Sequence, residues 1–162
     1  MIMQVLNKLL VLSCLSLMLS CTTEYVFEVE PVQVVQSGSE KPNRKNNIEF
    51  ISIAYADVFS SSISQTELNK LSVAYRSFGD KELVEDVLIK NFLNNPLAQI
   101  PSKTEMLQDV EQFIEDSYLR FYNREPSNYE SWFLKKQIED NTEIDPELIY
   151  YSMMTAEEYR FY

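Results

Sequence analysis

Histidine is missing from this 162-residue chain, and glycine and cysteine each occur only twice. The lack of histidine excludes a self-contained Ser-His-Asp triad, a histidine metal site and a His-ligated haem. Gly38 and Gly79 are too far apart to form a glycine-rich phosphate loop. Tight β-hairpin turns also depend on glycine, so the same scarcity favours helices. We therefore predict an all-α chain without a cofactor.

Basic residues are also scarce. The chain has 14 Lys and Arg but 25 Asp and Glu, which gives a net charge of -11. A strongly acidic surface repels the phosphates of nucleic acids and anionic lipid headgroups. We therefore expect no nucleic-acid partner.

The first 20 residues have the layout of an export signal. Lys8 precedes an apolar run from Leu9 to Leu19, and no other charge occurs before Glu24. A membrane-spanning helix needs about 20 apolar residues, so this run is shorter than an ordinary membrane-spanning helix. A lipoprotein signal, a plain secretory signal and an uncleaved anchor are the three interpretations that the run allows.

Leu17-Met18-Leu19-Ser20-Cys21 resembles the lipobox of bacterial lipoprotein precursors, with Met18 where leucine is usual. The resemblance implies cleavage after Ser20 and acylation of Cys21, which would hold the protein to a membrane by lipid. Cleavage would remove Lys8 and no acid, so the net charge would fall from -11 to -12. The residues after Cys21 include no aspartate that would retain the protein at the inner membrane, which favours the outer membrane and leaves the leaflet open.

The composition divides the remaining chain into a linker, residues 21–47, and a helical domain, residues 48–162. Residues 36–47 have hardly any apolar side chains and cannot bury enough surface to offset the entropy lost on ordering. The valine-rich segment 25–35 is predicted to belong to this spacer, or alternatively to lie against the domain or a partner as an edge strand.

Helix-start signals recur along the domain. A first helix begins near Ile48, and a last short turn opens at Thr155. Gly79 is predicted to stop the second helix. The chain between them has capping boxes that begin at Ser64, Ser102 and Ser127, and single caps at Asp80 and Asp145.

These signals recur in one order, which predicts two three-helix units, residues 48–96 and 102–162, in a bundle of about six helices. Phe50-Ile51 corresponds to Phe113-Ile114, and Ser64 with Glu67 corresponds to Ser127 with Glu130. The alternative is that any two triplets of amphipathic helices look alike.

The second unit has a helix with Tyr118, an Arg-x-Pro turn at Arg124, a helix with Trp132, and a closing Glu158-Tyr159. In this pattern it resembles a helical domain of unknown function found in secreted bacterial proteins, and phycobilisome linker domains. The resemblance implies an all-helical module for assembly or attachment rather than catalysis.

Aromatic residues crowd the end of the chain and suggest an interaction surface. Arg124 could present its planar fork to a carboxylate of a partner, or it could pair with a nearby glutamate of its own chain. The aromatic residues could be an exposed patch, which Phe133 would join, or core. The candidate interface residues are Arg124, Trp132, Tyr150, Tyr151, Tyr159, Phe161 and Tyr162.

These observations predict a lipid-anchored, non-enzymatic accessory of another protein of the cell envelope. An accessory that binds glycan or peptidoglycan is the first alternative. A glycoside hydrolase with two carboxylates is a distant one. Its candidate acids are Glu115/Asp116, Glu139/Asp140 and Glu157/Glu158.

Overall fold

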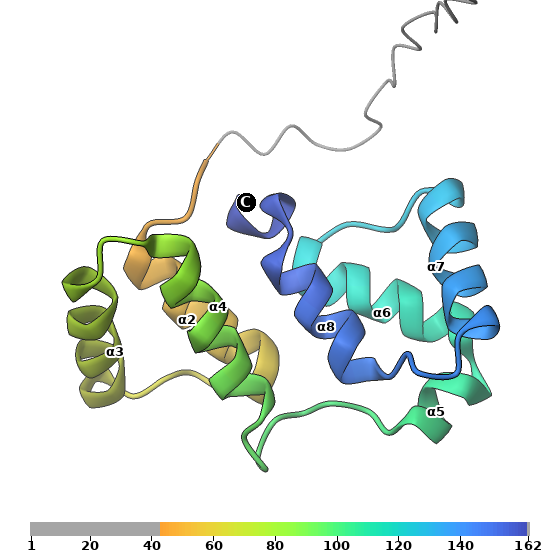
Figure 1. Ribbon diagram of the computed structural model, residues 1–162, viewed down its shortest axis with the longest axis horizontal. Helices are drawn as coiled ribbons and strands as arrows, with labels where there is room; N and C mark the ends of the chain where they lie inside the picture. The colour runs from red at the N-terminus through yellow and green to blue at the C-terminus, as the bar shows by residue number, and fades with distance from the viewer. Residues whose placement is uncertain (1–42, 162) are drawn as a thin grey trace, which may run out of the picture. The chain divides into compact units, whose positions relative to one another are not determined.

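The structure, a computed structural model, describes residues 43–161 (Figure 1). Over these residues the chain forms helices and no β-strand, which confirms the predicted all-α fold. Cys21, the segment 25–35 and Tyr162 lie outside the described residues. The helices are α2 (Asn47–Phe59), α3 (Gln65–Ser77), α4 (Lys81–Leu93), α5 (Lys103–Gln108), α6 (Val110–Tyr122), α7 (Asn128–Asp140), α8 (Pro146–Thr155) and the 3-10 helix η2 (Glu157–Arg160).

Side-chain caps begin all seven α-helices of the described region. The predicted capping boxes at Ser102 and Ser127 are both complete, and Asn46 forms a further one at the start of α2. At Ser64 the hydroxyl accepts from the backbone N–H of Glu67, which is half of the predicted box. Asp80 and Asp145 cap α4 and α8 as predicted. Each cap gives an acceptor to an N–H that the helix itself leaves without one.

Two helices replace the single helix predicted from Ser102 onward. Asp109 leaves the helical conformation at φ -149° and ψ 85°, and its carboxylate accepts from the backbone N–H of Gln112. Aspartate competes in this way with the helix around it. Leu107, which lies just before this break, is exposed.

Gly79 does not have the left-handed conformation expected of a helix-stopping glycine. The described non-glycine residues with positive φ are Ser60 and Asn123, which end α2 and α6. α3 ends instead with Phe78 in an extended conformation. The ammonium group of Lys81 donates to the carbonyls of Tyr75 and Phe78 at 2.7 and 2.6 Å. A side chain thus satisfies carbonyls that a glycine cap would otherwise serve.

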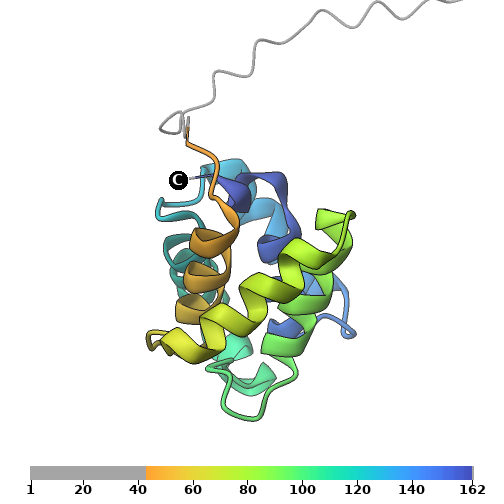
Figure 2. The same cartoon turned by 90° about the vertical axis from the view of Figure 1, so that its left-hand side faces the viewer.

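The helices pack as two sets of three. α2 lies against α3 and α4, α6 lies against α7 and α8, and the two sets meet where α4 lies alongside α8 (Figure 1). Figure 2 looks at the first set from the side of α3, with the second set behind it. This order is compatible with the predicted repeat, which stays a prediction. Over the described residues, no helix combines the length and the apolar character that crossing a membrane requires.

Tyr159 of η2 lies between the two sets and is 0% exposed. Its ring packs edge-on against Phe50 of α2 and Phe121 of α6, at centroid distances of 5.9 and 6.1 Å. Its hydroxyl donates to the carboxylate of Asp57 at 2.7 Å. Burial raises the pKa of Asp57 above its usual value, although this hydrogen bond opposes the rise.

Changing Tyr159→Phe should lower the free energy of unfolding by about 1–3 kcal/mol, because the partly buried Asp57 carboxylate would lose its hydroxyl donor. Urea denaturation of the full chain, followed by far-UV circular dichroism, measures this change. Tyr129→Phe, at a side chain that is 68% exposed, is the matched control and should change stability by less than about 0.5 kcal/mol. Equal losses in the two variants would contradict the structural role of the Tyr159 hydroxyl.

Candidate functional site

The Arg124 guanidinium is fully engaged within the chain. Nε and one Nη donate to the Glu158 carboxylate at 2.7 and 2.8 Å, and both Nη atoms donate to Glu130 at 3.0 and 2.8 Å. The fifth N–H donates to the carbonyl of Glu125 at 3.1 Å. Because all five donors are used, Arg124 has none left for a partner carboxylate. Arg124 therefore pairs with glutamates of its own chain, which is the second of the two interpretations that the sequence allows.

Tyr118 and Tyr122 extend this ion-pair cluster into the core. The Arg124 guanidinium carbon lies 5.1 and 5.6 Å from the centroids of their rings. Burial, followed by the nearby Glu130 charge, raises the pKa of Tyr118 to about 12. The hydrogen bonds from Arg124 hold the pKa of Glu130 at about 2. The cluster therefore ties the turn between α6 and α7 to η2.

The predicted aromatic residues do not gather on one surface. Tyr150 and Tyr159 are buried, so they belong to the core. Tyr151 and Phe161 are half-buried, and the Tyr151 hydroxyl donates to Asp86 at 2.6 Å. Trp132 alone among the described aromatic candidates is exposed, at 56%.

Trp132 has two exposed aromatic neighbours on α7, Tyr129 at 68% and Phe133 at 46%. The Tyr129 ring lies 6.0 Å from Trp132 and 6.1 Å from Phe133, and it is nearly parallel to the Phe133 ring. We call these three residues the α7 aromatic face. Positions separated by three and four residues share one side of a helix. That spacing could have revealed Tyr129 in the sequence, but it does not tell an exposed face from a buried one.

An apolar groove adjoins this face. It has a volume of about 370 Å³ and lies among α6, α7 and α8. Tyr129 and Phe133 of the α7 aromatic face contribute to its wall. The groove is lined by Tyr118, Tyr122, Tyr129, Glu130, Phe133, Leu134, Gln137, Ile144, Leu148, Ile149, Ser152 and Met153.

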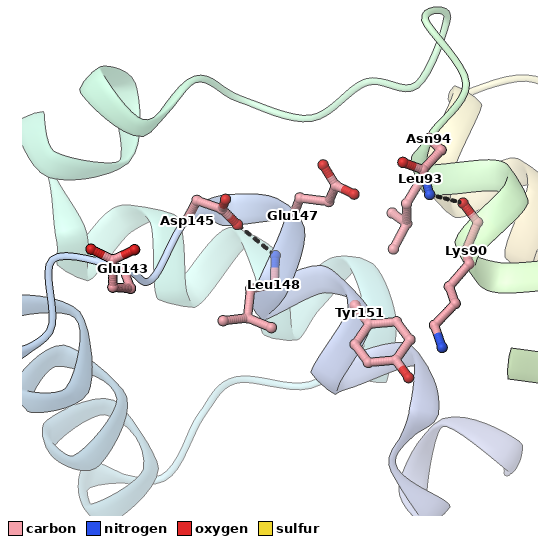
Figure 3. A pocket seen from close by; sticks show the side chains of 8 residues that line it. All are labelled: Lys90, Leu93, Asn94, Glu143, Asp145, Glu147, Leu148 and Tyr151. Carbon is pink, nitrogen blue, oxygen red and sulfur yellow. Dashed lines mark hydrogen bonds between the residues drawn. The ribbon is translucent and has the colours of Figure 1, made fainter.

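A second hollow, of about 460 Å³, lies between the end of α4 and the start of α8 (Figure 3). Figure 3 shows Glu143 at one end, Lys90 and Tyr151 at the other, and Leu148 between them. We call it the acidic hollow, because Glu143, Asp145 and Glu147 outnumber its one cation, Lys90. Leu148 lines this hollow and the groove alike, so the two adjoin.

Some charged side chains of the acidic hollow are bonded within the chain, and others are not. Asp145 accepts from the backbone N–H of Leu148 at 2.8 Å and so caps α8. Lys90 forms an ion pair with Asp86 at 2.8 Å, and this hydrogen bond, followed by the one from Tyr151, lowers the pKa of Asp86. Glu143 and Glu147 are exposed, and neither side chain forms an ion pair with the described chain.

The carboxylates considered for hydrolysis lie elsewhere. Glu158 is bonded to Arg124, and Glu157 lies 3.7 Å from Arg160. The other four are exposed, and none of the six lines the groove or the acidic hollow. Within residues 43–161, no cluster of three or more acidic or cysteine side chains is arranged to hold a metal ion.

Comparison with known proteins gives no relative: no protein-family model, curated protein or solved structure matches the chain significantly. The resemblances to the lipobox and to the bacterial helical domains therefore stay predictions.

Changing Arg124→Met should lower the free energy of unfolding by about 2 kcal/mol at pH 6, because two partly buried carboxylates would lose the guanidinium that pairs with them. The pKa of Glu130 is lowered from 4.5 to about 2, so its contribution is present above about pH 4.5 and is lost as the pH falls towards 2. The difference between the variant and the original protein should therefore shrink over that range. Urea denaturation at a series of pH values measures it.

The control for this experiment is Lys135→Met, which breaks the exposed ion pair between Lys135 and Glu111. Its effect should stay below about 0.5 kcal/mol. A loss for Arg124→Met that does not change between pH 6 and pH 2 would contradict the assigned role of the ion pairs.

Proposed function

We propose that this chain is a lipid-anchored protein of the cell envelope, whose helical domain binds another envelope protein without catalysing a reaction. The binding surface in this proposal is the α7 aromatic face with the adjoining apolar groove. The observation that carries it is the exposure of Tyr129, Trp132 and Phe133 on one helix.

The composition of this surface supports a protein partner. Tryptophan and tyrosine are enriched at the centres of protein interfaces, where they commonly contribute most of the binding energy. Exposed apolar side chains occur singly on many proteins, but three aromatic rings beside an apolar groove form a continuous patch. The net charge of -11 leaves nucleic acid as an unfavourable partner.

The anchor in the proposal is Cys21. It would be the sole cysteine after removal of residues 1–20, so it could form no disulfide within the chain. Each acyl methylene contributes about 0.8 kcal/mol of membrane binding, and stable anchoring takes more than one chain. An acylated Cys21 would keep the helical domain close to the membrane and to proteins embedded there.

A glycan-binding accessory is the second candidate, and one observation favours it. Tyr129 and Phe133 are nearly parallel, at 18° between ring planes, and offer exposed flat faces on which a sugar ring could stack. The groove beside them is mostly apolar and provides few partners for sugar hydroxyls, which favours the protein-binding proposal.

Changing Trp132→Ala should weaken capture of the partner from detergent-solubilised membranes by about 30-fold, the effect of losing a central interface residue worth about 2 kcal/mol. The full chain serves as bait, and the affinity is measured by titrating it. Phe78→Ala is the matched control, because Phe78 is an equally exposed aromatic residue outside α7. The control should bind normally, and soluble cell-wall sugar should not compete. Complete displacement by sugar would favour the glycan-binding candidate instead.

Mass spectrometry of the protein from its own membranes should find a chain that begins at Cys21 with acyl groups on that residue. Cys21→Ser should abolish the modification, while Cys14→Ser should leave it intact, because Cys14 lies within the removed segment. An intact N-terminal methionine, or an unmodified Cys21 thiol, would contradict the proposed anchor.

A further inference from the structure

We infer that the apolar groove and the acidic hollow together seat a basic amphipathic helix of the partner protein. This inference rests on the proposed function and adds the chemistry and the secondary structure of the segment that is bound. Three features of the molecule support it: the ridges that flank the groove, the groove's lack of backbone hydrogen-bond partners, and the charges at its end.

The walls of the groove are spaced for a helix. On α7 the lining residues Tyr129, Phe133 and Gln137 follow one another at intervals of four. On α8, Leu148 and Ser152 have the same interval. Side chains four residues apart form ridges, and the side chains of another helix fit between such ridges. A segment with apolar residues at intervals of three and four would match both walls.

The groove favours a helix over an extended segment. An extended peptide gains its affinity mainly by adding backbone hydrogen bonds to an exposed sheet edge. Residues 43–161 contain no sheet, and only Arg44 and Phe161 form an isolated bridge. A helix satisfies its own backbone groups and can therefore enter an apolar groove without leaving them unpaired.

The charge at the end of the groove selects a basic segment. Leu148 is 45% exposed and separates the apolar lining from Glu143 and Glu147. Figure 3 shows these acids around the start of α8. Lys90, the cation of the hollow, is already paired with Asp86. A helix that lies in the groove and extends past Leu148 would bring its next side chains to Glu143 and Glu147, where Lys or Arg is favoured and Asp or Glu is repelled.

The two cations of α7 do not reverse this preference. Lys136 lies over the Trp132 ring at 5.5 Å, and Lys135 pairs with Glu111. Neither of them lines the groove or the acidic hollow. The bound helix is therefore expected to be apolar along α7 and basic at the end that passes Leu148.

Site-specific photo-crosslinking in the producing cells tests the inference on the full chain. The photoreactive residue p-benzoylphenylalanine would replace Phe133 in the groove wall or, as the matched control, Phe78 outside it. We expect a protein adduct from position 133 and none of that mass from position 78. Mass spectrometry of the adduct should locate the crosslink in a segment with apolar residues at helical spacing and a net positive charge.

Charge reversal tests the acidic end separately. Glu143→Lys combined with Glu147→Lys should lower the yield of the position-133 adduct about ten-fold, as expected for reversing two charges at the rim of an interface. Glu115→Lys is the control, because Glu115 is exposed on α6 and lines neither hollow. It should leave the yield unchanged. Circular dichroism of each variant checks that the helices are retained.

The outcomes separate the two proposals. A protein adduct whose crosslinked segment is acidic or lacks helical apolar spacing, or whose yield withstands the double reversal, would overturn the basic helix but leave the protein-binding function standing. If position 133 gives only glycan adducts or none at all, the proposed function fails along with it.

Discussion

One hydrogen bond, from the buried Tyr159 to Asp57, connects the two ends of the helical domain. It joins η2, at the end of the described chain, to α2 at its beginning, and the Tyr159 ring touches α6 as well. Burying a phenol hydroxyl costs free energy unless it finds a partner. Asp57 is that partner, and the Lys45 ammonium group lies 3.8 Å from the centroid of the same ring.

The residues on either side of Tyr159, Glu158 and Arg160, also contact the two sets of helices. Glu158 bonds to Arg124 at the turn between α6 and α7. Arg160 lies 3.0 Å from the buried Glu85 of α4, close enough for an ion pair although the two groups are not aligned for a hydrogen bond. Glu85 is aligned with Tyr75, whose hydroxyl donates to it at 2.6 Å. Consecutive residues of one short helix thus contact both sets of helices.

The packing of the helices buries some aromatic side chains and leaves others exposed. Tyr150 and Tyr159 are buried in the core, and the guanidinium of Arg124 is hydrogen-bonded to Glu158 and Glu130. α7 contributes Ile138 to the core and keeps Tyr129, Trp132 and Phe133 in solvent. The surface that remains has an apolar groove on one side of Leu148 and acidic side chains on the other. That combination is the physical basis for proposing a basic amphipathic partner.

Local chemistry could be read from the sequence, because each signal depends on residues a few positions apart. The all-α fold and the caps at Ser102, Ser127, Asp80 and Asp145 follow from such signals. The sequence does not predict the break at Asp109, because an aspartate can either cap a helix or lie on its solvent-exposed face. The packing of the helices decides which of the two occurs.

The candidate site depended on tertiary structure. Periodicity places Tyr129, Trp132 and Phe133 on one side of α7 but does not reveal whether another helix covers that side. The burial of Tyr159 rests on contacts with residues about a hundred positions away, such as Asp57. The sequence by itself determined where most of the helices begin and which amino acids were available, because those properties are local. Only the packing of the two sets decided which aromatic rings became core and which stayed exposed, because burial depends on residues distant in the chain.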